Sequence, residues 1–501
     1  MRSVPVSKSR HFTFLPTSTK NSLSYTPQLC DIGESVSILI TPVRRDPCSS
    51  SFDSGRGYEQ AYQFSNVVEA LPENKVVKLR QGDIWTNPNR RTKLSLAEMS
   101  GAPLRVLTYN ILADQNAYER SSAGKQVSFY PYVDVSILDR KRRMPLLLHE
   151  ILSYQADIIC LQEVDERMWR RFFRPALEQA GYQGYFSTKQ AEGQMEGIAT
   201  LWSLHRFESV SNDEMKTYSL NKLVMETAME RNNKQWKSAA SIANIFDNNL
   251  ELKDVIETKL GHVLQMVSLP LRRAKMTEKG KSTATPERLL LANTHLFYHP
   301  LGAHIRLMQM YAICRHFDRF QREESISYPM ILSGDMNSSL RRAAGYLLVN
   351  RKVLPSHAQI REHYNTFQWT DRNSSDEASV AEIQTRIEHT EEPGQHDETK
   401  WEDFPCIELP EHFPSFLPGY PTEPEFTHYL DAFVGSLDHI FISQSSQYRP
   451  FGLATFCCAP MPTVEDATEN VAMPSEKFPS DHVSLVADVT FTKLEVTDNL
   501  E

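Results

Sequence analysis

Acidic, amide and imidazole side chains stand at several places where an apolar run of the sequence ends. Asn110, Glu163 and His295 each close such a run, and Asp335 and Asn337 follow another. If these runs are strands, their ends meet at one edge of a sheet, where functional side chains gather. We therefore expect these five side chains to converge in one site although they lie far apart in the sequence.

A second group of polar residues lies near the end of the sequence. Asp438 stands inside an apolar run, and Ser480, Asp481 and His482 precede the last one. Acids, amides and imidazoles are thus present together, without an obvious thiol nucleophile. Hard oxygen ligands from one or two carboxylates suit Mg²⁺, which leaves its other positions for water and a substrate phosphate. Glu163 is the best single candidate for a metal ligand.

The residue types also divide the work of phosphoester hydrolysis. A carboxylate with a neighbouring amide can position the attacking water, and Asp335 with Asn337 fits that task. A histidine held by a carboxylate can donate hydrogen bonds to a pentacovalent phosphate, because the carboxylate fixes its tautomer and orientation. His482 with Asp438 is the natural pair. The sequence thus favours metal-assisted hydrolysis of a phosphate ester.

Each of these residues also has an ordinary structural interpretation. An isolated acid at a strand end, such as Glu163, is more often a cap or turn residue than a metal ligand. His295 can be a core histidine, and Asn110 can hold a turn through its side-chain amide. The functional interpretation depends on the whole set and on its order along the chain.

Composition limits the classes of protein that need consideration. The 501 residues, 40% of them hydrophobic, allow one to three domains. No window holds the roughly 18 uninterrupted apolar residues that a membrane span needs. Seven scattered cysteines without zinc-site spacing fit a reducing compartment. A net charge of -9 argues against gripping long duplexes, because proteins that do so neutralise many phosphates.

The order of patterns predicts a tail and two domains. Residues 1–24 contain many Ser and Thr and no acid, which fits a mitochondrial transit segment or, equally, a solvated tail. Residues 25–98 alternate short β-rich runs, such as 36–40 and 76–79, with turn residues, and predict a small β domain. Residues 104–491 mix strands and helices, and predict a larger α+β catalytic domain.

The larger domain is expected to hold eight or more strands in two packed sheets, with helices on the outer faces. Helices are expected at 140–154, 166–181 and 304–320, where apolar residues recur every three or four positions above charged faces. The expected strands are 104–110, 157–163, 197–202, 262–270, 289–297, 329–335, 437–443 and 483–490.

Five short motifs, in this order, resemble the endonuclease/exonuclease/phosphatase superfamily. One motif alone is weak evidence, but the ordered set is specific and covers roughly residues 104–491. The resemblance implies an α+β fold, a four-layered α/β sandwich in which two packed mixed β-sheets are flanked by helices. The motifs are Tyr109-Asn110-Ile111-Leu112, Leu161-Gln162-Glu163-Val164, Asn293-Thr294-His295-Leu296, Gly334-Asp335-Met336-Asn337 and Ser480-Asp481-His482.

Further features are similar to the deadenylase-type branch, which includes nocturnin-like, Angel-like and mitochondrial 2′,5′-phosphodiesterase proteins. Residues 25–33 are also similar to the mitochondrial 2′,5′-phosphodiesterase proteins, in a β domain that precedes their catalytic domain. The similarity to that β domain begins partway through it. The local features that favour that group are Asn110-Ile111-Leu112-Ala113-Asp114, Tyr130-Pro131-Tyr132, Lys189-Gln190 before Glu196-Gly197, and Leu296-Phe297-Tyr298-His299-Pro300.

Carried onto this sequence, the resemblance implies three groups of functional residues. The catalytic group, which acts on the phosphate and the attacking water, comprises Asp335, His295, His482 and Asp438. The metal group, whose members bind Mg²⁺ or support the side chains that bind it, comprises Glu163, Asp335, Asn337, Asn110 and Asp481. The group expected to contact substrate, with surface solvation or a core position as the alternative, comprises His299, Arg306, Gln309 and Phe426.

The function implied by the resemblance is a Mg²⁺-dependent 3′-to-5′ exoribonuclease or phosphodiesterase that hydrolyses 2′,5′-oligoadenylate and poly(A) tails and leaves 5′-phosphates. A conventional 3′,5′ deadenylase, a nocturnin-like 2′-phosphatase and a catalytically inactive RNA-binding relative stay open as alternatives. Single-stranded RNA or oligoadenylate is the expected partner, with no membrane and no obligate protein partner. The expected compartment is the mitochondrial matrix, with the cytoplasm as the alternative.

Overall fold

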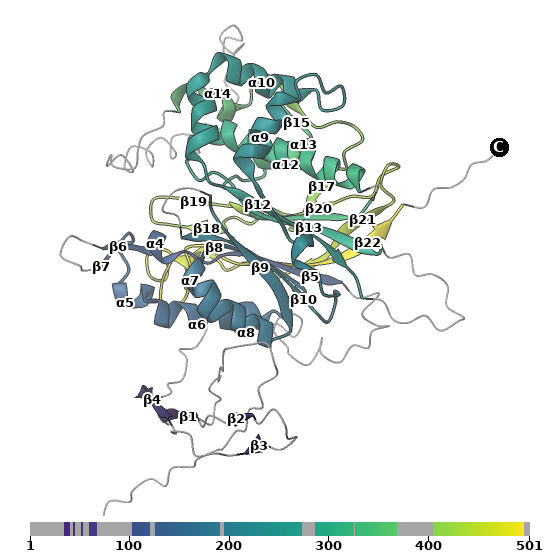
Figure 1. Cartoon of the computed structure of the whole chain (residues 1–501). Coiled ribbons are helices and arrows are strands. Elements are labelled where there is room, and N and C mark those ends of the chain that lie inside the picture. The colour runs from purple at the N-terminus through teal and green to yellow at the C-terminus, as the bar shows by residue number, and fades with distance from the viewer. Residues whose placement is uncertain are drawn as a thin grey trace, which may run out of the picture. The chain divides into compact units, whose positions relative to one another are not determined.

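The computed structural model of the chain describes residues 103–120, 126–190, 195–272, 286–324, 326–367 and 404–494, and four short strands between residues 35 and 67 (Figure 1). The chain divides into two compact units, Met1–Glu73 and Asn74–Glu501. The strands of the first unit are β1 (Ser35–Ile40), β2 (Arg44–Arg45), β3 (Phe52–Asp53) and β4 (Gln60–Val67).

Within the first unit, β1 pairs antiparallel with β4, and β2 pairs antiparallel with β3. The strand expected at 36–40 coincides with β1. The predicted tail 1–24, the strand expected at 76–79 and the remainder of the predicted domain 25–98 lie outside the described residues.

The first large sheet of the second unit has the strand order β21-β22-β5-β8-β10-β9. Only β5 and β8 are parallel neighbours, and the other neighbouring pairs are antiparallel. The strands are β5 (Leu104–Asn110), β8 (Ile158–Asp165), β9 (Tyr182–Thr188), β10 (Glu196–Ser203), β21 (Phe451–Cys458) and β22 (Leu485–Lys493).

The second large sheet has the strand order β11-β12-β13-β14-β20-β17. Here β13 and β14 are parallel, and the other neighbouring pairs are antiparallel. The strands are β11 (Lys216–Ser219), β12 (Val263–Pro270), β13 (Arg288–His295), β14 (Met330–Asp335), β17 (Phe416–Pro418) and β20 (Asp438–Ser443).

The two sheets pack face to face, and alternate side chains of each central strand point to opposite faces. In β5, Leu104 and Val106 enter the core between the sheets, whereas Leu107 and Tyr109 pack beneath the helices. Leu289 of β13 reaches the same inter-sheet core from the other side. Burial on both faces explains why these strands read as nearly continuous apolar runs.

Helices cover the outer face of each sheet, which gives four layers (Figure 1). The first sheet carries α6 (Arg140–Ser153), α7 (Glu166–Met168), η2 (Trp169–Phe173) and α8 (Arg174–Gln179). The second sheet carries α9 (Leu220–Met229), α10 (Ser238–Asn248), α11 (Leu250–Asp254), η4 (Val255–Lys259), α12 (Ala303–Glu323), α13 (Ala343–Asn350) and α14 (Ala358–Thr366). The four-layered α/β sandwich is thereby confirmed.

Short elements complete the second unit and lie around the ends of the sheets. They are α4 (Asp114–Ala117), β6 (Tyr118–Arg120), β7 (Gln126–Ser128), α5 (Val135–Leu138), η3 (Asn212–Glu214), β15 (Lys352–Val353), β16 (Ile407–Glu408), β18 (His428–Tyr429), β19 (Val434–Gly435) and α16 (Val464–Thr468). Among the helices that the structure describes, none has the length and apolar character required to cross a membrane.

Candidate active site

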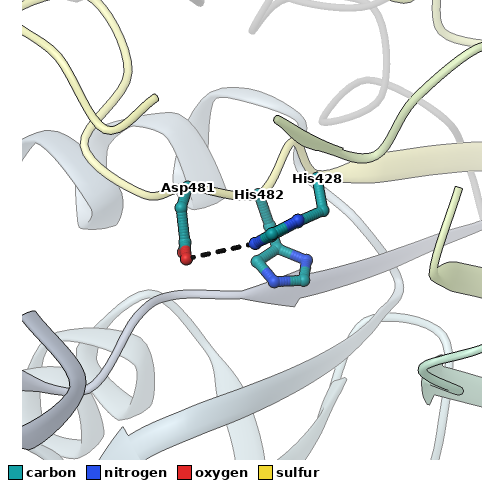
Figure 2. A group of neighbouring side chains, drawn as sticks. All are labelled: His428, Asp481 and His482. Carbon is teal, nitrogen blue, oxygen red and sulfur yellow. Dashed lines mark ion pairs between the residues drawn. The ribbon is translucent and has the colours of Figure 1, made fainter. Parts of the chain in front are cut away.

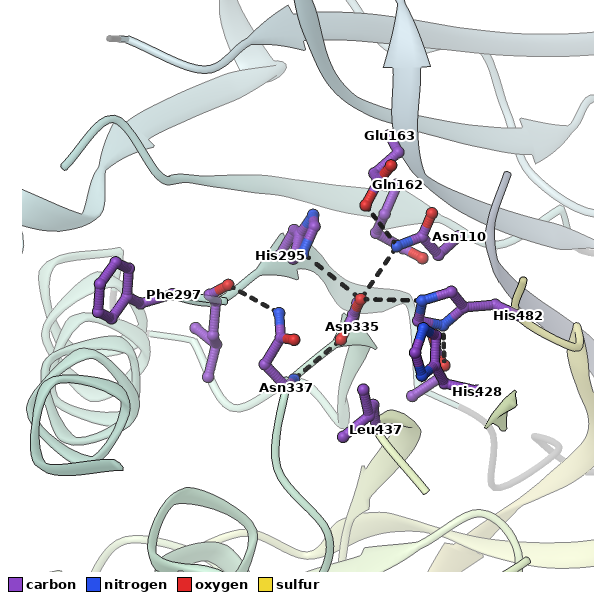
Figure 3. Close-up of polar contacts among 12 residues, drawn as sticks. Asn110, Gln162, Glu163, His295, Phe297, Asp335, Asn337, His428, Leu437 and His482 are labelled. Carbon is purple, nitrogen blue, oxygen red and sulfur yellow. Dashed lines mark hydrogen bonds and ion pairs between the residues drawn. The ribbon is translucent and has the colours of Figure 1, made fainter. Parts of the chain in front are cut away.

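Strand register places three of the predicted residues side by side in the second sheet. His295 ends β13 and pairs with Asp335 at the end of the parallel strand β14. Asp335 in turn pairs with Asp438, which begins the antiparallel strand β20. The three side chains therefore share one edge of the sheet, as the sequence predicted, and all three are buried. Asn110, at the end of β5 in the first sheet, meets them from the opposite layer (Figure 3).

Asn110 joins the two sheets at the centre of the site. Its Nδ2 donates to Glu163 Oε1 at 3.1 Å and to Asp335 Oδ2 at 3.0 Å. Its Oδ1 accepts from the backbone N–H of Leu112 at 3.1 Å, which fixes the orientation of the amide. One amide thus holds two carboxylates from different sheets close together, because its nitrogen offers both of the donors that this requires.

An irregularity in β8 directs Glu163 into the site. Val164 pairs with Gly197 of β10, but Leu161 pairs with Ala199, so that two residues of β8 face one of β10. Glu163 sits in this bulge with a φ of 54°, a conformation that non-glycine residues adopt at a cost of about 1–3 kcal/mol. Strain of this kind is typical of functional sites, where the bulge turns a side chain toward its task.

Two further donors anchor the Glu163 carboxylate. Its Oε2 accepts from the backbone N–H of Ala113 at 3.1 Å and from Asn116 Nδ2 at 2.7 Å. Both donors come from the segment that follows β5, and the side chain of Glu163 remains only partly buried. Neutral donors therefore hold the carboxylate in place, and its charge stays available to a cation.

Asp335 is almost fully buried at the centre of the site. Its Oδ1 accepts from the backbone N–H of Asn337 at 2.8 Å, and its Oδ2 lies 3.4 Å from His295 Nε2 and 3.9 Å from His482 Nε2. Burial and the nearby charge of Asp438 raise the pKa of Asp335 to about 7. A carboxyl group that exchanges a proton near neutral pH is suited to act as a general base.

His482 and Asp438 form the predicted pair. His482 Nδ1 lies 2.7 Å from Asp438 Oδ2, and Thr427 Oγ1 donates to the same oxygen at 2.7 Å. Burial alone lowers the pKa of His482, but the charge of Asp438 and its hydrogen bond outweigh burial and raise that pKa to about 10. The imidazole is therefore held in its charged form, with Nε2–H as a donor.

His295 has the opposite character although it lies across Asp335 from His482. Burial, with the positive charge of Lys189, holds the pKa of His295 well below its ordinary value. The ring is therefore neutral, and its buried Nδ1 has no hydrogen-bond partner among the described residues. Asn337 completes this side, with a φ of 47° and an amide that donates to the backbone oxygen of Leu296 at 3.1 Å.

Asp481 lies apart from the Glu163–Asp335 carboxylates, beyond His482. The phenol of Tyr130 donates to Asp481 Oδ2 at 3.0 Å, and His428 Nε2 lies 3.4 Å from the same oxygen (Figure 2). Burial acts to raise the pKa of Asp481, but the neighbouring imidazole of His428 and the charge of His482 hold it well below its ordinary value. Its predicted role as a ligand of the same metal as Glu163 stays a prediction.

The residues predicted to contact substrate do not form one group. Arg306 is buried and donates to the backbone oxygens of Phe297 (2.9 Å), His299 (2.6 Å) and Pro300 (3.1 Å). Gln309 is buried too, and its Oε1 accepts from the backbone N–H of Phe297 at 3.0 Å. Both side chains support the 297–300 loop from behind, which contradicts the predicted contact with substrate.

Phe426 and His299 differ in their surroundings. Phe426 is 2% exposed and packs in a small core with Phe478 and Val483, so the predicted role in base stacking is wrong. Its apolar ring belongs to the interior because strands β18 and β19 close over it. His299 is only partly buried on the loop that Arg306 supports, and its predicted contact with substrate stays a prediction.

One polar pair of the site received no chemical role from the sequence. Lys189 follows β9 and lies 2.5 Å from Glu196 at the start of β10, with side chains 13% and 2% exposed. Burial opposes the charge of Lys189, but Glu196 and Glu163 raise its pKa, so it stays a cation beside the carboxylates. Its position directly after a strand is the pattern that identified Glu163, and β9 itself was not predicted.

The donor set is consistent with a divalent cation. Glu163 and Asp335 share one amide and bring carboxylate oxygens together in a largely buried site. Asp438 Oδ1 is buried and has no hydrogen-bond partner among the described residues, although His482 offsets the charge of this carboxylate through Oδ2. Oxygen ligands of this kind suit hard cations. The residues present therefore fit a metal at the Glu163–Asp335 edge.

Comparisons with known proteins find relatives of similar sequence over most of this chain. Human 2′,5′-phosphodiesterase 12 is 27% identical over 466 residues, which cover 93% of this chain and 61% of the human protein. Carbon catabolite repressor protein 4 homolog 1 of Arabidopsis thaliana is 26% identical over 406 residues, which cover 78% of this chain and 59% of the plant protein. The chain thus spans less than two thirds of the length of these relatives.

A solved structure and a family model agree on the fold. The crystal structure of ANGEL2, a 2′,3′-cyclic phosphatase, superposes with a TM-score of 0.54 at 19% identity and covers 79% of this chain and 97% of that one. The model of the Endonuclease/Exonuclease/phosphatase family matches residues 107–482, a range that runs from β5 to His482. It includes every residue of the site described above. This chain therefore belongs to the endonuclease/exonuclease/phosphatase family.

Proposed function

We propose that this chain is a Mg²⁺-dependent phosphodiesterase that hydrolyses the terminal linkage of 2′,5′-oligoadenylate or of a single-stranded poly(A) tail, from the 3′ end toward the 5′ end. The observation that carries the proposal is the hydrogen-bonded series Glu163–Asn110–Asp335, which faces the charged His482–Asp438 pair. The similarity to human 2′,5′-phosphodiesterase 12 supports the choice of linkage.

A metal fits the first part of this series. Enzymes of the family depend on divalent metals, and Glu163 with Asp335 would hold the ion while Asn110 orients both carboxylates. When bound, the ion supplies Lewis-acid stabilisation of the phosphoryl and leaving oxygens. Mg²⁺ is proposed because the available donors at this edge are oxygens.

The side chains of the site then divide the reaction between them. Asp335, whose pKa lies at about 7, accepts a proton from the attacking water, and the adjacent Asn337 helps to orient that water. His482 donates its Nε2–H to a phosphoryl oxygen as negative charge develops there. Asp438 keeps that imidazole charged and oriented through Nδ1. His295, neutral and across Asp335, adds a second imidazole that binds phosphate without a charge.

Two alternatives share this chemistry. The similarity to the Arabidopsis carbon catabolite repressor protein 4 homolog favours a 3′,5′ deadenylase as the second candidate. A nocturnin-like 2′-phosphatase uses the same groups on a terminal phosphate. An inactive RNA-binding relative is disfavoured because the acids and imidazoles are all present and mutually bonded.

The discriminating experiment is a digestion of matched substrates. Linear 2′,5′-linked and 3′,5′-linked oligoadenylates of equal length are incubated with the full chain in Mg²⁺, in EDTA, and with the Glu163→Gln variant. Faster release of 5′-AMP from the 2′,5′ substrate, lost in EDTA and in the variant, is expected. Equal or greater cleavage of the 3′,5′ substrate would replace the proposal by the deadenylase. Cleavage that persists in EDTA would exclude the metal.

A further inference from the structure

A second group of metal-ligating side chains lies next to the carboxylate site: His428, Asp481 and His482 (Figure 2). His428 of β18 forms a β-bridge with His482, and their ring centroids lie 4.5 Å apart. All three residues are buried, and one ligand atom from each lies within 4.8 Å of the other two. The three therefore surround a space of the size that a single small cation needs.

His428 carries an unsatisfied polar atom in this group. Its Nδ1 is buried and has no hydrogen-bond partner among the described residues, and the residue is only 8% exposed. Its Nε2 has the carboxylate of Asp481 at 3.4 Å, longer than a good N–H···O hydrogen bond. A buried polar group left in this state in a native fold commonly marks the place of an ion or a water.

Neighbouring side chains already orient the other two ligands. Asp438 bonds to His482 Nδ1 at 2.7 Å, which leaves Nε2 as the nitrogen free to bind a cation. Tyr130 donates to Asp481 Oδ2 at 3.0 Å and fixes that carboxylate. A carboxylate on the second nitrogen of a histidine, and a hydrogen bond on a ligating carboxylate, are the usual surroundings of metal ligands in proteins.

We propose that His428, Asp481 and His482 form a binding site for a borderline divalent cation, with Zn²⁺ as its representative, distinct from the oxygen site at Glu163. Two imidazoles and one carboxylate form a ligand set that Zn²⁺ uses with one position left for water. Mg²⁺ prefers oxygen ligands throughout, so the two sites differ in the metal that they select.

Occupation of this site has a consequence for the reaction. Zn²⁺ binds in place of the proton on His482 Nε2, and that proton passes to solvent. His482 then has no N–H to offer a phosphoryl oxygen, so Zn²⁺ inhibits hydrolysis that Mg²⁺ supports. The inhibition rests on the proposed function, whereas the binding of Zn²⁺ does not.

Zn²⁺ binding is measured on the full chain, freed of metal by a chelator and returned to excess Mg²⁺ so that the oxygen site is filled. A chromogenic chelator competes for Zn²⁺ during the titration. We expect one tight equivalent in the wild type and a loss of affinity of more than about 100-fold in His428→Asn, because loss of a neighbour that only orients a ligand costs about 10- to 100-fold. The matched control is His412→Asn, which removes a partly exposed histidine bonded to Asp318.

Further variants keep the test decisive if the first one folds poorly. His428→Cys supplies another zinc ligand and is expected to keep the tight equivalent, whereas Tyr130→Phe is expected to weaken it. Co²⁺ in the wild type should show the visible absorption of a four-coordinate site, and His428→Asn should lose it. Equal Zn²⁺ affinity in the wild type and in His428→Asn, or no tight equivalent in the wild type, would overturn the proposal. Because binding is measured without substrate, failure of the proposed hydrolysis would leave this result unaffected.

Discussion

The charge on His482 should depend on Asp438, and Asp438→Asn tests this dependence. The pKa of His482 rises from 6.5 to about 10, so this environment favours the charged ring by about 5 kcal/mol. Asparagine keeps the shape of the side chain but removes the negative charge that offsets burial. The pKa of His482 should then fall toward 6.5, because burial disfavours the charged form and only the charges of Asp481 and Asp335 still favour it. At pH 7.5 the ring changes from almost fully charged to mostly neutral.

The loss of the charged donor should appear as a change in kcat and in its pH dependence. We expect kcat at pH 7.5 to fall by about 10²–10³, the cost of losing one donor to a developing oxyanion. The group is active when protonated, so the wild-type rate should fall as pH rises through about 10. In Asp438→Asn this descending limb should move below pH 7.

The assay is steady-state release of 5′-AMP from oligoadenylate across pH at saturating Mg²⁺. Asp431→Asn, which neutralises an exposed acid on the same segment, is the control and should keep the wild-type profile. His482→Ala combined with Asp438→Asn should cost little more than either change alone, because the two residues act as a unit. An unchanged descending limb in Asp438→Asn, or fully additive losses, would refute the assigned pair.

Four further predictions follow from the site and the sequence. Glu163→Gln should abolish turnover and weaken Mg²⁺ binding, as measured by calorimetry. Its circular dichroism spectrum should stay that of the wild type. Near-normal rates in this variant would exclude this metal site. Arg306→Ala should lower the free energy of unfolding in urea by about 3 kcal/mol, because it removes a buried charged group that donates hydrogen bonds to three backbone oxygens. A loss of kcat without loss of stability would instead indicate contact with substrate. The logarithm of the affinity for single-stranded oligoadenylate should fall with the logarithm of the salt concentration at a slope near 2, if about three phosphates are neutralised. Circular oligoadenylate should resist cleavage. A much steeper slope or efficient cutting of the circle would indicate an endonuclease. Residues 1–24 fused to a fluorescent protein should direct it to mitochondria if this basic, acid-free segment is a transit peptide, and a diffuse signal would leave the cytoplasm as the proposed compartment.

The strands that could be predicted from the sequence are those with neighbours on both sides. The eight expected runs correspond to β5, β8, β10, β12, β13, β14, β20 and β22, which are the interior strands of the two large sheets. The four unpredicted strands, β9, β11, β17 and β21, are the edges of those sheets. Interior strands are buried on both faces and read as apolar runs, whereas all four edge strands are partly exposed, and β9 and β11 also carry polar residues.

The same reasoning explains which site residues were placed correctly. His295 and Asp335 were predicted from strand ends and Asp438 as the partner of His482, and strand register brings the three together. Arg306 and Gln309 were predicted to contact substrate because they follow His299 on the same loop and helix start, but most residues of α12 are buried. The helices α9, α13 and α14 pack against it, and their weak patterns did not predict them. A charged residue on such a helix faces backbone oxygens and not a ligand.

The density of carboxylates in this site explains why it needs a cation. Asp335 and Asp438 are paired across neighbouring strands, and Asn110 draws Glu163 toward Asp335. Burial, and after it the like charge of Asp438, raises the pKa of Asp335 to about 7, because exclusion of water disfavours the charged carboxyl and strengthens the repulsion. The charged ring of His482 offsets Asp438, but the groups that bind Glu163 directly are neutral amides and one backbone N–H. A divalent ion at Glu163 would relieve the remaining repulsion, lower the pKa of Asp335 and so convert it to the base that hydrolysis requires.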